Sequence, residues 1–132
     1  MELKTPYAFG KTVEAPYGET VAKVRAALAA EGFGIMTEID PKAKFREKLG
    51  KEFRDYVILG ACNPAMAYEA FAREINIGAL LPCNVCVYTT DAGPTAVLVM
   101  DPEAVLALIG NPEMTELAKE VKARMERVLA AL

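Results

Sequence analysis

Two hydrophobic patterns alternate along this chain, and together they predict strands and helices in mixed order. Short apolar or alternating runs predict five strands, at residues 7–15, 33–39, 55–62, 83–90 and 95–100. Apolar residues at helical spacing predict helices at residues 18–31, 41–49, 64–74 and 103–109. A final, longest helix carries a stripe at spacings of three and four: Met114, Leu117, Val121, Met125, Val128 and Leu132. Residues 75–82 are mostly apolar and predict a connecting segment that packs against the rest of the protein.

The boundaries between these elements carry matching signals. Four helices are predicted to start at an Asp-Pro or Asn-Pro pair: Asp40-Pro41, Asn63-Pro64, Asp101-Pro102 and Asn111-Pro112. Asp or Asn caps the first free backbone N–H groups, and Pro suits the first helical position because its nitrogen has no proton to leave unpaired. Gly32, Gly50 and Gly110 follow as helix stops.

The order of the elements predicts the fold class. The runs at 83–90 and 95–100 flank Asp91-Ala92-Gly93, a turn that predicts a hairpin of adjacent antiparallel strands. A hairpin inside a strand–helix alternation favours an α+β fold over a doubly wound one. We therefore expect one two-layer domain, residues 1–132, with helices packed on a mixed or antiparallel sheet. A chain of this length buries about two-thirds of its unfolded surface, enough for a single core.

Composition excludes several functions. The chain has no His, Ser, Gln or Trp, so it holds no Ser-His-Asp triad, Cys-His dyad or HExxH zinc motif. Its net charge of −3 disfavours nucleic-acid binding. No apolar stretch reaches the roughly 18 residues of a membrane span. The first residues lack a hydrophobic signal core, and three cysteines fit reduced thiols, so we expect a cytoplasmic protein.

Two Cys-Asn pairs are the most informative feature for function. Cys62-Asn63 ends one apolar run and Cys83-Asn84 opens the next, with one short helix between them. Cys62 precedes a predicted helix N-terminus, whose field favours a thiolate, so we expect it to be the most reactive thiol, with a lowered pKa. A small buried residue at a strand end is the structural alternative for Cys62. Asn63 is expected to cap the helix.

Cys83 and Cys86 form a C-x-x-C sequence, but its context argues against redox and zinc sites. In a strand, positions i and i+3 point to opposite faces about 10 Å apart, which exceeds the span of a disulfide. We therefore expect Cys86 to face away from Cys83 and to be a packing residue. Zinc would require all three thiols and a carboxylate, so we predict no metal site.

Other candidates for a site lie nearby in the sequence. Tyr68 and Glu69 are placed to frame a pocket over the thiols, and Tyr88 offers a phenol. Six cations at residues 42–54 are interspersed with carboxylates, so a solvated helix face is expected there, with a small-anion site as the alternative.

Four segments together resemble a known family. They are FGIMTEID, LGACNPAMAYEAF, IGALLPCNVCVY and an Asp-Pro pair after the following strand. Over residues 33–102 the chain resembles the bacterial and archaeal domain-of-unknown-function family number three hundred and two. The family motif falls on ten residues: Glu38, Gly60, Cys62, Asn63, Pro64, Gly78, Leu81, Pro82, Cys83 and Asn84. The resemblance implies a compact α+β domain, dimeric and without an established activity, with an aliphatic residue at the position of Cys86.

The leading functional interpretation is a module that binds a small ligand in a pocket rimmed by the two Cys-Asn pairs. The expected ligand-binding residues are Cys62, Asn63, Cys83, Asn84, Glu38 and Tyr68, without a cofactor. There are two alternatives. One is a thiol redox enzyme or sensor, with Cys62 as the thiolate and Cys83 as the resolving partner. The other is a soft-metal carrier. Whether there is catalysis stays open. The long C-terminal stripe and the family resemblance predict a homodimer.

Overall fold

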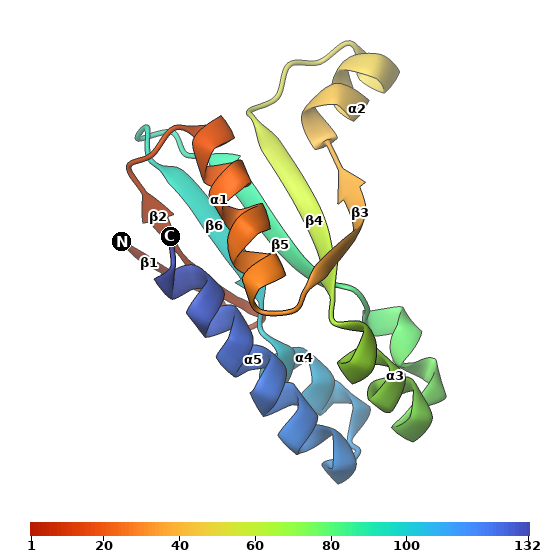
Figure 1. Ribbon diagram of the computed structural model, residues 1–132. Helices are drawn as coiled ribbons and strands as arrows, with labels where there is room; N and C mark the ends of the chain where they lie inside the picture. Colours follow the sequence, from red (N-terminus) through yellow and green to blue (C-terminus); the bar gives the residue numbers. More distant parts are fainter.

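The computed structural model describes residues 1–132 and consists of a six-stranded antiparallel sheet with helices on one face and at one end (Figure 1). The strands are β1 (Glu2–Lys4), β2 (Ala8–Val13), β3 (Gly34–Ile39), β4 (Tyr56–Cys62), β5 (Cys83–Thr89) and β6 (Thr95–Met100), in the spatial order β1-β2-β6-β5-β4-β3. Every neighbouring pair is antiparallel. The predicted α+β fold and the 83–100 hairpin are therefore confirmed, while β1 was not predicted.

Helices connect the strands and continue to the C-terminus. The α-helices are α1 (Tyr17–Ala30), α2 (Pro41–Leu49), α3 (Pro64–Arg73), α4 (Pro102–Leu106) and α5 (Thr115–Ala130). Three short 3₁₀ segments are η1 (Ile75–Leu80), η2 (Ala107–Ile109) and η3 (Pro112–Met114). The predicted apolar connection thus contains a 3₁₀ turn, and Ile77 within it is buried, as expected for a segment held by packing. No helix is long and apolar enough to cross a membrane.

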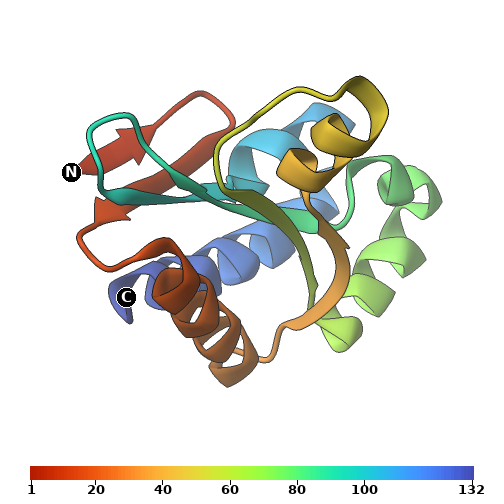
Figure 2. The same cartoon turned by 90° about the horizontal axis from the view of Figure 1, so that it is seen from above.

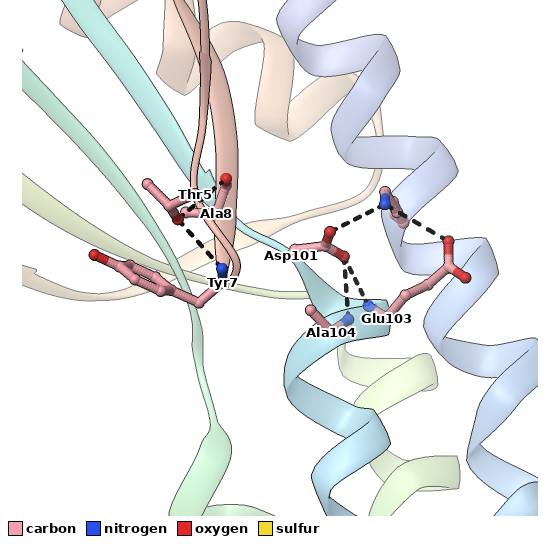
Figure 3. A network of polar contacts seen from close by, with 7 residues as sticks. Thr5, Tyr7, Ala8, Asp101, Glu103 and Ala104 are labelled. Atoms are coloured by element: carbon pink, nitrogen blue, oxygen red, sulfur yellow. Dashed lines mark hydrogen bonds and ion pairs between the residues drawn. The ribbon is translucent and has the colours of Figure 1, made fainter.

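The Asp-Pro and Asn-Pro signals act as predicted. Asp40, Asn63, Asp101 and Asn111 each accept a backbone N–H with the side chain at the start of a helix. Asp101 does more than cap α4: its second carboxylate oxygen accepts a hydrogen bond from Lys122 Nζ of α5 at 3.0 Å (Figure 3). The same carboxylate therefore starts one helix and anchors another, and it raises the pKa of Lys122.

The main core lies between α1, α5 and one face of the sheet; Figure 2 shows these helices together on one side, with α2 away from both. The register aligns apolar residues across the central strands, so that Val57, Val87 and Val97 form one row and Leu59, Val85 and Val99 the next. A second, smaller cluster joins α3, η1, α4, η3 and α5. Because the C-terminal stripe contributes to both clusters, α5 holds them together, and the stripe is core rather than a free dimer contact.

The opposite face of the sheet, called here the open face, contributes no residue to either buried cluster. Its small residues Ala8 and Ala96 are buried, but seven larger apolar side chains are partly exposed: Leu3, Ile39, Tyr56, Ile58, Cys86, Tyr88 and Leu98. Beside it stands α2, which has no buried residue at all. The six cations at residues 42–54 surround this helix, and all but Lys51 pair with carboxylates, as expected of a solvated surface.

Candidate functional site

A narrow crevice lies where the two hydrophobic clusters meet, and it contains three of the predicted site residues. Cys62, Asn63 and Cys83 line it, in a cavity of about 40 Å³. The other lining residues come from α3, η1, α4, α5 and the neighbouring strand ends: Phe33, Ala61, Met66, Ala67, Ala70, Ile77, Leu81, Leu106, Leu117 and Val121. We call this cavity the thiol crevice. Asn63 is its single polar residue, so the space is apolar and suited to a nonpolar group.

The strand register explains how the two thiols come together. Ala61, not Cys62, lies directly opposite Cys83 on the core face. Cys62 is the last residue of β4 and lines the crevice from the point where the chain turns into α3. The two thiols are close enough that Cys62 contributes to the pKa of Cys83. Both remain reduced, as does Cys86.

Gly60 explains part of the family motif. A Cβ at this position would collide with Thr37 Oγ1 and Pro82 Cγ, so the close approach of β3 and the start of β5 to β4 requires glycine. Pro82 directly precedes Cys83, and the same contact therefore fixes where β5 begins. The glycine of the Leu-Gly-Ala-Cys-Asn-Pro motif therefore has a packing role: it lets the strands that carry the crevice residues come close together.

The expected low pKa of Cys62 is wrong. Burial raises the pKa of Cys62, and no cation offsets it. At the start of the following helix, Asn63 Oδ1 accepts from the Met66 N–H at 3.1 Å, so the cap and not the thiol occupies this N–H group. Burial, followed by the nearby Cys62, raises the pKa of Cys83 to about 11. Both thiols are therefore protonated near neutral pH.

Three predicted site residues lie away from the crevice. Asn84 is exposed on β5, Tyr68 is 79% exposed on α3, and Glu38 pairs with Arg25 at 2.6 Å. Glu69 pairs with Arg73 on the helix surface and also lies outside the crevice. The structure thus brings together one complete Cys-Asn pair and only the cysteine of the other.

Cys86 faces away from Cys83, as predicted, but it does not face a core. It lies on the open face opposite Ile58, because side chains three residues apart in a strand point to opposite sides. Tyr56 donates a hydrogen bond to its sulfur. No group of three or more Cys, Asp or Glu side chains comes together to hold a metal ion, so the ligands of a zinc site are not assembled.

Sequence reasoning missed most of the crevice wall. Phe33, Met66 and Leu106 belong to three different elements, and no local pattern links them. Two signals were available: Leu117 and Val121 belong to the C-terminal stripe, and Ile77 and Leu81 to the apolar connection. A wall assembled from segments this far apart in sequence becomes visible only in the folded chain.

Comparison with known proteins identifies the family but no activity. Residues 9–132 match DUF302, a domain of unknown function. The structure is similar to the crystal structure of an uncharacterized conserved DUF302 protein from Bacillus stearothermophilus, with a TM-score of 0.87 and 27% sequence identity. That similarity covers 94% of this chain and 96% of the other. No curated protein matches the sequence. Because the family match spans nearly the whole chain, the protein belongs to the DUF302 family.

Proposed function

We propose that the protein binds a small apolar ligand, or the apolar end of a larger one, in the thiol crevice. The observation that carries this proposal is an apolar space at the junction of two hydrophobic clusters, lined by Cys62, Asn63 and Cys83. Ligand sites are typically apolar with a few polar groups that orient the ligand. Here the Asn63 amide and the two thiols are those groups.

The size of the crevice limits the ligand. Its volume of about 40 Å³ is far below the roughly 300 Å³ at which pockets hold drug-sized ligands. The larger hollows of the surface, such as a groove of about 420 Å³ along α4 and η3, contain none of the thiols. A group of a few heavy atoms therefore fits directly, and a larger ligand requires the α3–η1 segment to move away from α5.

A thiol redox role is the second candidate, because Cys62 and Cys83 lie within electrostatic range of each other. Its chemistry is disfavoured by burial, which raises the pKa of both thiols and leaves little thiolate to react near neutral pH. Ligand binding requires no thiolate and is the function that the apolar lining supports better. Three free thiols also support a reducing, cytoplasmic location.

Methyl NMR with xenon as the probe tests ligand binding, because a single xenon atom suits a dry apolar space of this size. In protein labelled at the methionine methyl groups, xenon should shift the Met66 signal in a saturable way because Met66 lines the crevice. The exposed Met36 signal on β3 serves as an internal reference. Failure of the Met66 signal to respond, or an equal response of Met36, would contradict the proposal.

A matched pair of variants on α3 locates the binding. Ala67→Leu places extra carbons in the crevice and should weaken xenon binding about tenfold or more, equivalent to about 1.4 kcal/mol. Ala72→Leu makes the same chemical change on the exposed side of that helix and should leave binding unchanged. Equal binding by both variants would place the xenon elsewhere.

A further inference from the structure

The chain between β4 and β5 leaves the sheet and returns to it at one place. Residues 63–82 contain α3 and η1, and Figure 1 shows these elements beyond the end of the sheet. Both ends of the segment are fixed, because Ala61 pairs with Cys83 across β4 and β5. Its inner side forms one wall of the thiol crevice, through Met66 and Ile77 among others. The segment therefore covers the crevice and is attached to the sheet beside both thiols.

Little buried surface holds this segment to the rest of the protein. Ala70 is the one buried residue of α3, and Ile77 is the one buried residue of η1. The C-terminal helix α5, by contrast, buries six of its residues. Tyr68 and Ile75 of the segment are 79% and 75% exposed. Segments with few buried apolar contacts open at a lower free energy than the core, so this segment has the packing of a movable element.

The wall that faces the segment is anchored more firmly. Phe33 and Val121 line the crevice from that side, and both belong to the main core. Val121 lies on α5, which joins the two hydrophobic clusters and is tied to Asp101 through Lys122 Nζ at 3.0 Å. Because one wall is anchored and the other is not, an opening of the crevice moves residues 63–82.

Two hydrogen bonds at the far end of the segment tie it to η3. Arg73, the last residue of α3, donates from Nη1 to the Glu113 carbonyl oxygen at 2.9 Å. Asn111 Nδ2 donates in return to the Arg73 carbonyl oxygen at 3.4 Å. Glu69 Oε1 lies 3.6 Å from Arg73 Nη2, one turn earlier on the helix, and orients the guanidinium. No other hydrogen bond joins residues 64–81 to an element outside the segment.

We infer that residues 63–82 form a lid over the thiol crevice and that the hydrogen bonds of Arg73 keep it closed. The inference rests on the proposed function, because an opening of the crevice matters only if a ligand enters it. When these bonds break, the middle of the segment moves away from η3 while its two ends stay in the sheet. Ala70 and Ile77 belong to the smaller hydrophobic cluster, so the main core stays in place. Ligands larger than the closed space of about 40 Å³ then reach both thiols.

Alkylation of Cys83 measures the opening, since this thiol is 7% exposed and lines the closed crevice. Arg73→Ala should raise its labelling rate in the folded protein about fivefold, the effect of one lost hydrogen bond on a local opening equilibrium. Arg54→Ala is the matched control, because Arg54 Nη1 also donates to a carbonyl oxygen at 2.9 Å, that of Thr89 at the far end of β5. That variant should leave the Cys83 rate unchanged. Cys86, on the open face, serves as the internal reference.

Hydrogen exchange separates local opening from global unfolding, and it can be read in the wild type alone. The amides of α3 and η1 should exchange together, well before those of β5 and β6. Arg73→Ala should speed exchange in α3 and η1 and leave β5 and β6 unchanged. Exchange of α3 in step with β5 and β6 would overturn the inference. So would an unchanged Cys83 rate in Arg73→Ala, or an equal rise in Arg54→Ala.

Neither measurement includes a ligand. The lid can therefore fail these tests while xenon binding in the crevice stands, and xenon binding can fail while the lid is shown to open.

Discussion

The two faces of the sheet are made from alternate residues of the same strands, yet one face is buried under helices and the other stays partly exposed. On the covered face, Leu59, Val85 and Val99 are fully buried under α1 and α5. On the open face, Ile58, Cys86 and Leu98 occupy the next row and stay partly exposed. The difference shows that strand pattern selects which residues can be buried, while the helices decide which face is covered.

The cysteines of β5 show the same contrast within one strand. Cys83 belongs to the main core, and burial is the largest cause of its raised pKa. Cys86 also has a raised pKa, but the hydrogen bond from Tyr56 acts in the opposite direction. Two thiols three residues apart are therefore in different chemical environments, because strand alternation directs them to opposite faces and the helices cover only one of these faces.

Removing side chains from the two faces should produce the largest difference. Leu59→Ala should lower the free energy of unfolding by about 2–5 kcal/mol because it leaves a cavity in the main core. Leu98→Ala should cost no more than about 1 kcal/mol, since a partly exposed side chain leaves no closed cavity. Urea denaturation measures both values. Equal costs for Leu59→Ala and Leu98→Ala would remove the distinction between the faces.

The pH dependence of stability should distinguish Cys83 from Cys86. Folding raises the pKa of Cys83 from 9.0 to about 11, so the native state holds this proton more tightly than the unfolded state. Its contribution to stability is complete below pH 9 and is lost as the pH rises toward 11. The loss should reach about 2 kcal/mol, following from the size of that shift.

Chemical denaturation below pH 9 and near pH 11 measures this loss. Cys83→Ala should remove that part of the pH dependence, and Cys86→Ala should retain it because Cys86 keeps a partner in Tyr56. A wild type and a Cys83→Ala variant with parallel pH profiles would show that the native thiol is not held in its protonated form.

The two asparagines that follow Cys62 and Cys83 should show the smallest difference. Asn63→Ala removes the side chain that caps α3 and should lower the free energy of unfolding by about 1 kcal/mol. Asn84→Ala removes an exposed strand side chain that makes no hydrogen bond within the chain, and it should have almost no effect. Thermal unfolding of both variants provides the measurement; equal effects would contradict the assignment of Asn63 as a cap.

Local signals in the sequence determined the elements and their boundaries. The Asp-Pro and Asn-Pro pairs predicted four helix starts because capping depends only on neighbouring residues. The Asp91-Ala92-Gly93 turn predicted the hairpin, and strand alternation predicted that Cys83 and Cys86 face opposite ways. Four residues of the family motif also line the thiol crevice: Cys62, Asn63, Leu81 and Cys83.

The tertiary structure decided what depends on distant contacts. Asn84 and Tyr68 share a motif or a helix with crevice residues, but register and helix rotation direct them to solvent. The pKa of Cys62 is raised rather than lowered because the thiol is partly buried, and Asn63 caps the helix that follows it. The strands carry apolar residues on both faces, and the packing of α1 and α5 determined which face became the core. Burial depends on which segments meet in three dimensions, and a one-dimensional pattern does not contain that information.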